Sequence, residues 1–163
     1  YFVDAVASYK GDFILFPEYL NAPLMADYNH LGYAEAIRKL AEYTEEIRER
    51  FLNLAISYNV NIVTGSFPLV ENDRLYNTGF LCRRNGTYET YRKIHVTPDE
   101  IRTWGLSGGD MVQVFETDCG PIGVSRTFQG SGGTGDDHSV CTFSDGYTKR
   151  VFAGALLCPG TCH

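Results

Sequence analysis

The ten residues YRKIHVTPDE at positions 91–100 are the most informative stretch for how this chain is expected to fold. They place Lys93 at the end of a predicted strand and Glu100 seven residues later. Pro98 lies between the two, and a proline lacks the N–H of a helix and disfavours helical backbone at the residue before it. The stretch therefore predicts that a strand ends at the lysine and that a separate element carries the glutamate.

A second apolar run brings another carboxylate to the end of a strand. Residues 13–16, FILF, are uninterrupted hydrophobic side chains, as in a fully buried strand, and Pro17 and Glu18 follow directly. Enzymes with α/β folds present their site residues where sheet strands end. We therefore expect Glu18 and Lys93 to meet at one edge of a sheet.

Composition indicates a globular domain with a core of its own. The chain has 163 residues, of which 44% are hydrophobic and 21% charged. Its net charge of −6 argues against nucleic acid or an anionic membrane surface as a partner. No apolar run approaches the roughly 20 residues that a membrane-spanning helix needs.

Cysteine usage and the first residues predict a cytoplasmic fragment. Five cysteines cannot all pair within one chain, and no secretory signal pattern is present, so we expect reduced thiols in the cytoplasm. The sequence begins with Tyr1, inside a helix predicted over residues 1–7. We therefore expect the parent protein to begin further upstream.

Periodicity predicts one long helix and several strands. Apolar residues recur at helical spacing between positions 29 and 58, with charged residues largely on the opposite, solvated face. The next strand, 61–66, is expected to stop at Gly65 and Pro68. Asn85-Gly86 predicts a hairpin with a type I′ turn. Further strands are predicted at residues 75–83, 87–93 and 112–116 and from residue 121, which indicates a mixed α/β sheet.

Taken together, residues 13–124 resemble the nitrilase superfamily of carbon–nitrogen hydrolases. Glu18 follows a strand within Phe-Pro-Glu, Lys93 lies in a Lys-x-His pattern, and Glu100 lies where the family has a second glutamate. Asn77-Thr78, in RLYNT, matches the Tyr-Asn pair that the family commonly writes before the hairpin.

The resemblance implies a partial αββα four-layer sandwich with an incomplete sheet. It also implies hydrolysis of a small-molecule amide or nitrile through a cysteine nucleophile, with no cofactor and no metal. Glu18 would then be the general base, Lys93 would stabilise the tetrahedral intermediate, and Glu100 would help to hold the site. Tyr19 and Asn21, which follow Glu18, would line the substrate pocket, and the intact parent would be a homo-oligomer, commonly a dimer.

Plainer interpretations also exist: taken alone, Glu18 could be a surface carboxylate at the end of a strand, and Lys93 could be a solvated lysine. Asp99 and Glu100 could simply begin a helix, where acidic side chains suit the helix dipole. Tyr19 could be a packed aromatic residue, and His95 is expected to make a local structural hydrogen bond rather than to act as a base. A glycosidase that uses Glu18 and Glu100 would leave Lys93 unexplained.

The nucleophile is missing from the position where the family has it. The segment GPIGV at 120–124 matches the family, but SRTFQ follows, so that the cysteine falls on Thr127. Cys119 lies in a turn before this strand and is not expected to replace it. We expect residues 1–124 to be a partial hydrolase domain and residues 125–163 to be an aberrant tail.

A slipped reading frame is the simplest account of this tail. Codons can be chosen for residues 144–163 so that the next frame reads ATDTRNGFLRVRYCAQARAI, which resembles a later segment of the family. Losing a nucleophile costs on the order of a million-fold in turnover, so we expect this chain to be inactive. The alternative is an interaction module that pairs with an intact homologue through its long helix.

Two further candidate sites in the tail have weak support from the sequence. The glycine-rich residues 125–137 lack the GK[ST] signature of a phosphate-binding loop. The Cys158–Cys162–His163 spacing fits no common zinc template.

Overall fold

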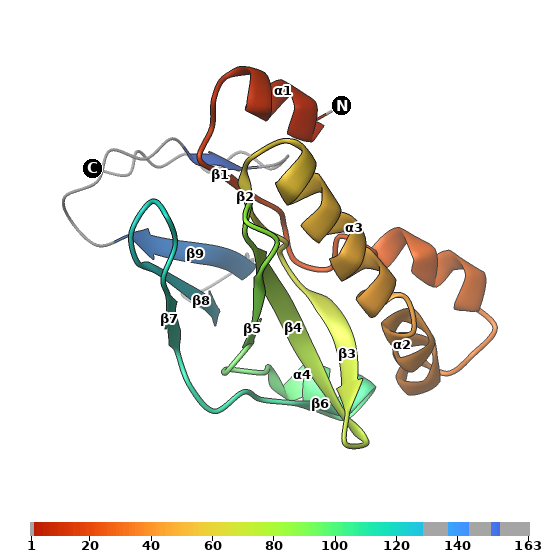
Figure 1. Ribbon diagram of the computed structural model, residues 1–163. Helices are drawn as coiled ribbons and strands as arrows, with labels where there is room; N and C mark the ends of the chain where they lie inside the picture. Colours follow the sequence, from red (N-terminus) through yellow and green to blue (C-terminus); the bar gives the residue numbers. More distant parts are fainter. Residues whose placement is uncertain (1, 129–136, 144–150, 154–163) are drawn as a thin grey trace.

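The computed structural model describes the backbone of residues 2–128, 137–143 and 151–153, and the side chains of residues 2–124 (Figure 1). Most of the glycine-rich loop, at 129–136, and the Cys/His end of the chain, at 154–163, lie outside the described residues. Of the expected tail, the structure thus describes three backbone segments.

Helices and strands alternate along the first half of the chain, and strands dominate the second half. The described elements are α1 (Phe2–Ser8), β1 (Phe13–Leu15), the 3₁₀ helix η1 (Ala22–Tyr28), α2 (Tyr33–Ala41), α3 (Thr44–Ser57), β2 (Asn61–Val63), β3 (Phe67–Glu71), β4 (Arg74–Cys82), β5 (Tyr88–Arg92), α4 (Pro98–Trp104), β6 (Leu106–Ser107), β7 (Gln113–Phe115), β8 (Ile122–Phe128), β9 (Asp137–Phe143) and β10 (Val151–Ala153).

The strands form two sheets. The larger sheet has the order β10-β1-β2-β4-β3, and β5 and β6 also pair with β4. Its β10, β1 and β2 are parallel, whereas β4 runs antiparallel to β2, β3 and β5. The smaller sheet is the antiparallel ladder β7-β8-β9. The mixed α/β architecture expected from the sequence is therefore confirmed.

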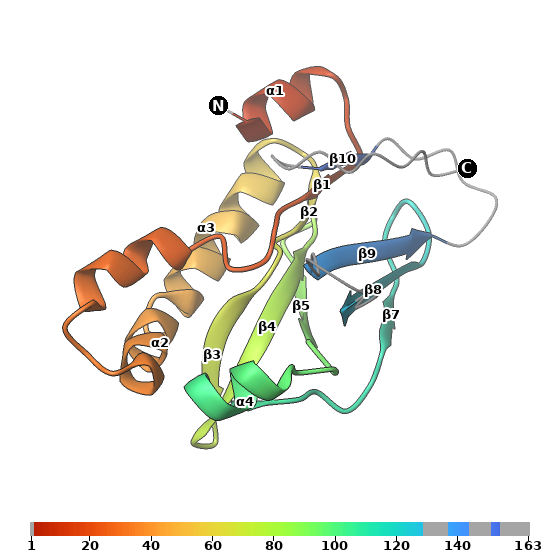
Figure 2. The ribbon, with the colours of Figure 1, turned by 180° about the vertical axis from the view of Figure 1, so that it is seen from behind.

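The larger sheet has a helical layer on one face and the smaller sheet on the other (Figures 1 and 2). Phe51 and Ala55 of α3 pack with Ile14, Ile62 and Phe80 on the first face. On the second face, members of β7 and β8 pack against strands of the larger sheet, and this cluster contains Phe13, Val63, Leu81, Tyr91, Phe115, Ile122 and Val124. Burial on both faces explains why the FILF run is apolar throughout.

The single helix predicted over residues 29–58 is wrong, because the chain forms α2 and α3 with a break between them. At the break, the N–H groups of Glu42 and Tyr43 donate to carbonyls three residues back, at 3.2 and 3.3 Å. This tightening places Thr44 in the interior, where its hydroxyl donates to the carbonyl of Pro68 at 2.6 Å. Tertiary contact thus overrides a continuous helical pattern.

Two predictions about turns also need correction. Strand pairing resumes at Phe67 despite Pro68, because β3 is an edge strand and a proline can be tolerated there. The hairpin around residues 85–86 is confirmed, but the type I′ turn is wrong, since Gly86 (φ 87°) and not Asn85 has a positive φ. Gly86 N donates to Arg83 O at 3.0 Å and Arg83 N to Thr87 O at 2.8 Å, which makes a three-residue loop ending in a left-handed glycine.

Within the described part of the chain, no helix combines the length and the apolar character needed to cross a membrane.

Candidate functional site

Glu18 is held at the edge of the larger sheet by the chain that continues from β1. Past the end of β1, Phe16 N donates to Val63 O at 2.9 Å, and Glu18 forms an isolated bridge with Ser66. Tyr19 N then donates to Ser66 O at 2.9 Å. The Glu18 side chain is 12% exposed, so its carboxylate lies at the margin of the interior.

Close backbone packing behind Glu18 requires two glycines. A Cβ at Gly65, where φ is 73°, would lie 1.8 Å from the carbonyl oxygen of Pro17. A Cβ at Gly79 would lie 2.1 Å from the carbonyl oxygen of Gly65 and 2.2 Å from the ring of Tyr91, whose hydroxyl donates to that same carbonyl. Only glycine at both positions lets these backbone segments stack and place Glu18 against β4.

Lys93 follows β5 directly, and its backbone is anchored on both sides. Its N–H donates to the carbonyl of Asn77 in β4 at 2.9 Å, and its carbonyl accepts from Gly109 N at 2.8 Å. A side chain at Gly109 would meet Arg92 Cβ at 2.8 Å, so this approach also depends on a glycine. The lysine side chain is completely buried, with 0% exposure.

Glu100 lies in the first turn of α4 and caps that helix. Thr97 Oγ1 accepts from Glu100 N at 3.2 Å, and Glu100 Oε2 accepts from Thr97 N at 2.7 Å, so the two residues form a capping box. Pro98 begins the helix and Gly105, in the left-handed region, ends it. The plain interpretation of Glu100 as a helix-start residue is therefore correct, but it leaves Oε1 available for a second partner.

The three predicted site residues converge around the lysine ammonium. Lys93 Nζ lies 3.0 Å from Glu100 Oε1 and 3.7 Å from Glu18 Oε1. Asn77, itself 1% exposed, donates from Nδ2 to Glu18 Oε1. A buried charge is tolerated only when it is paired, and here one cation faces two carboxylates. The arrangement can accept a proton at one carboxylate and present a positive charge beside it.

Tyr19 and Asn21 occupy different environments. The Tyr19 ring packs edge-on against Trp104 of α4, with centroids 5.7 Å apart, so it is a packed aromatic residue. Tyr19 has a φ of 49°, which is unusual for a bulky residue, and it directly follows Glu18 in the chain. Asn21 is 6% exposed, and neither polar atom of its carboxamide has a hydrogen-bond partner among the described residues. His95, expected to make a structural hydrogen bond, is exposed.

Cys82 and Cys119, the two thiols whose side chains are described, lie at the opposite end of the strands. Cys119 Sγ lies 2.9 Å from Arg84 and 3.9 Å from Asn61, the first residue of β2, whereas Glu18 is joined to Ser66, beyond the end of β2. Burial raises the pKa of the Cys119 thiol, and burial raises the pKa of Cys82 to about 12. Neither thiol is placed to serve the Glu18 site.

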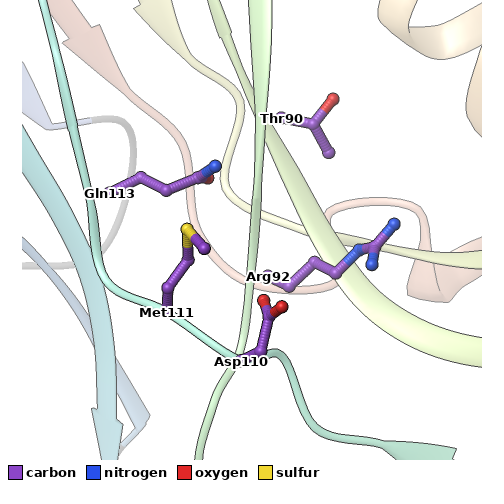
Figure 3. Close-up of a pocket in the computed structure, with 5 residues that line it drawn as sticks. All are labelled: Thr90, Arg92, Asp110, Met111 and Gln113. Carbon is purple, nitrogen blue, oxygen red and sulfur yellow. The ribbon is translucent and has the colours of Figure 1, made fainter.

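A surface hollow of about 240 Å³ lies between β5 and the segment that enters β7 (Figure 3). Thr90 and Arg92 line it from β5, and Asp110, Met111 and Gln113 line it from the other side. Its lining includes none of the three converging residues. Among the described side chains, no group of three or more His, Cys, Asp or Glu could hold a metal ion.

Two residues of the site were not assigned a role from the sequence. Thr97 had a readable signal, because Thr97-Pro98-Asp99-Glu100 is a capping-box pattern. Asn77 was noted as part of a matching motif, but a strand asparagine gives no sequence signal for a bond to a carboxylate 59 residues away.

Comparisons with known proteins identify the family of this chain. The family model for carbon–nitrogen hydrolases matches residues 2–126. A probable hydrolase, YhcX, of Bacillus subtilis is 42% identical over 124 residues, which cover 76% of this chain and 24% of that protein. The omega-amidase NIT2 of Xenopus tropicalis is 33% identical over 127 residues, which cover 72% of this chain and 44% of the relative.

Solved structures of the family share the fold. Nit3 of Saccharomyces cerevisiae, a nitrilase-superfamily member, matches with a TM-score of 0.55 and 24% identity, covering 68% of this chain and 40% of that one. An amidase mutant from Nesterenkonia sp. AN1, with acrylamide added at its active-site cysteine, matches with a TM-score of 0.53 and 17% identity, covering 71% and 44%. At these identities the likeness concerns the fold.

The chain spans less than half the length of the relatives it matches, namely 24% of the first and 44% of the second. Over most of its own length, however, it carries the family pattern. This chain therefore belongs to the carbon–nitrogen hydrolases of the nitrilase superfamily.

Proposed function

We propose that Glu18, Lys93 and Glu100 are the acid–base and electrostatic part of a centre that hydrolyses a small amide or nitrile through a thiol. One observation carries this proposal: a fully buried ammonium lies 3.0 and 3.7 Å from two carboxylates that come from different elements. A lysine is rarely buried without a reason of this kind. Tyr19 and Asn21 are proposed to border the substrate.

The roles follow from what each group can do. Glu18 Oε1 accepts the proton of the attacking thiol, and the thiolate forms a bond to the amide or nitrile carbon. For an amide, Lys93 stabilises the negative charge that develops on the substrate oxygen. Glu18 then returns the proton to the departing amine, and later takes one from the water that cleaves the thioester. Glu100 keeps Lys93 charged and in place.

We propose that this chain does not itself catalyse hydrolysis, because Thr127 occupies the position of the family's nucleophilic cysteine. Support comes from the adduct on the active-site cysteine of the Nesterenkonia amidase and from the distance of Cys82 and Cys119 from the site. Residues 125–163 are proposed to be an out-of-frame tail, and the intact parent a cytoplasmic homo-oligomer built as an αββα sandwich.

The test is ammonia release from a panel of primary amides and nitriles by the purified chain, beside Glu18→Gln and Lys93→Met. We expect all three proteins to stay at the buffer background. Release that disappears in both variants would overturn the proposed inactivity and support the site. Release that is unchanged in both variants would overturn the site.

The tail is tested separately by the nucleotide sequence across codons 123–127. A Cys-Tyr-Asp sequence in a neighbouring frame is expected there. Its absence from every frame would overturn the proposed slip.

A further inference from the structure

Asn77 contacts both halves of the proposed acid–base pair. Its side-chain Nδ2 donates to Glu18 Oε1, and its main-chain carbonyl accepts from Lys93 N at 2.9 Å. Glu18 follows β1 and Lys93 follows β5, and these strands do not pair with each other. Asn77 in β4 therefore links the two residues, in addition to their direct contact at 3.7 Å.

The orientation of the Asn77 amide follows from the charges around it. An ionised carboxylate only accepts hydrogen bonds, so beside Lys93 the amide must turn its NH₂ group toward Glu18. Asn77 is 1% exposed, so this bond lies in a region where a charge-assisted hydrogen bond is strong. An amide donor, unlike a second ammonium, adds no net charge to the site.

We propose that Asn77 is a positioning residue for Glu18: it holds the carboxylate as an ionised proton acceptor, at a fixed place relative to Lys93. This inference rests on the proposed function, because it assigns Glu18 the role of base. Asn77 touches no reacting atom in this account, and it acts by orienting Glu18 and by disfavouring its protonated form.

Carbodiimide coupling measures this directly, because the reagent attacks the protonated carboxyl group. The full chain and Asn77→Leu are labelled with a carbodiimide and glycine ethyl ester near pH 6, and each glutamate is quantified by mass spectrometry. Loss of a charge-assisted hydrogen bond should raise labelling of Glu18 about tenfold while Glu100 stays unchanged. Asn53→Leu, at an exposed position of α3, is the matched control and should change neither.

A purely structural role for Asn77 predicts a different pattern. General loosening of the fold would raise labelling of Glu18 and Glu100 together, and that outcome would overturn the inference. Unchanged labelling of Glu18 in Asn77→Leu would overturn it as well.

A swap of the amide and the carboxylate between positions 77 and 18 keeps the test valid if Asn77→Leu fails to fold. Asn77→Asp sets two carboxylates against each other, so its urea midpoint should fall relative to the parent chain as the pH rises from about 5 to 8. In Glu18→Gln/Asn77→Asp, the glutamine amide donates to the new aspartate, and the pH dependence of the parent chain should return. If the shifts in urea midpoint of the two single variants simply add in the double variant, the proposed pair is contradicted.

Failure of this inference and failure of the proposed function have different signatures. Where no protein releases ammonia, as expected, the swap and the labelling alone decide the assignment of Asn77. If release is found and proves independent of Glu18 while the swap restores the midpoint, the pairing stands and the hydrolytic role falls. If Glu18-dependent release is found while the swap does not rescue, the hydrolytic role stands and the assignment of Asn77 falls.

Discussion

The two ends of the β1–β2 pair carry charge clusters of similar size but very different character. At the end where β1 finishes, Lys93 and its two carboxylates have side chains that are 0–12% exposed. At the end where β2 begins, Arg84 pairs with Asp118 at 2.6 Å and with Asp12 at 3.6 Å, and Asp118 is 54% exposed. Distance alone would not separate these clusters.

Burial does separate them. An exposed ion pair gains little, since water screens both partners and the side chains lose entropy. A buried cation between two carboxylates is costly to form, and it persists when the surrounding backbone fixes all three groups. Here β1, β4, β5 and α4 each contribute such a constraint at the Glu18 end. The proposed site is thus the cluster whose burial costs more free energy. Three substitutions test this contrast between the two clusters.

Lys93→Met should have the largest effect. It leaves Glu18 and Glu100 buried with no cation between them, and breaking a buried pair costs about 3–5 kcal/mol. Urea unfolding at neutral pH measures this loss, and acidification should shrink it by protonating the carboxylates. Combining Lys93→Met with Glu18→Gln and Glu100→Gln should restore much of the stability. A cost near zero would show that Lys93 is not needed to compensate the two buried carboxylates.

Gly79→Ala should have an intermediate effect, because it acts on the packing behind Glu18 and adds no charge. Its methyl group would lie 2.1 Å from the carbonyl oxygen of Gly65, which is backbone and cannot rotate away. Overpacking of this kind costs about 1–3 kcal/mol in thermal or urea unfolding. Gly32→Ala, with no atom within 4 Å of the new methyl, is the packing control. Because Gly32 is the N-cap of α2, where glycine is preferred to alanine, its cost should stay below about 1 kcal/mol. Equal effects of the two would show that the close approach is not tight.

Asp118→Asn should have the smallest effect, below about 1 kcal/mol, because the ion pair is solvated. Burial alone would raise the pKa of Asp118, but hydrogen bonds from Asn61 and Arg84 outweigh it and hold that pKa below its usual value. The stabilisation is therefore present above the unfolded-state value of about 3.9 and is lost as the pH falls through the lower folded-state value. The difference in urea midpoint between the parent chain and the variant should accordingly vanish in strong acid. A difference that grows on acidification would mean that the carboxylate destabilises the fold.

Elements that are defined by short stretches of sequence could be predicted from the sequence alone. A capping box needs only the four residues 97–100, a buried strand needs only an apolar run such as 13–16, and the hairpin needs a glycine near its tip. The convergence of Glu18 with Lys93 came from knowing that strand ends gather at one edge of a sheet, together with the family resemblance.

Contacts between distant segments were decided only by the tertiary structure. At the break before Thr44, its hydroxyl donates to the carbonyl of Pro68, 24 residues away. Pro68 is tolerated because β3 turned out to be an edge strand. No local pattern encodes either fact, so the long helix and the early end of the strand pairing were mispredicted.

By itself, the sequence indicated the family, the mixed α/β fold and the three charged residues that the structure brings together, because short motifs and strand patterns can be read from the linear order of residues. The tertiary structure decided that Asn77 joins Glu18 to Lys93 and that Cys82 and Cys119 lie at the far end of the sheet. Which side chains meet across a sheet depends on strand order and register, and these are set by packing of the whole core.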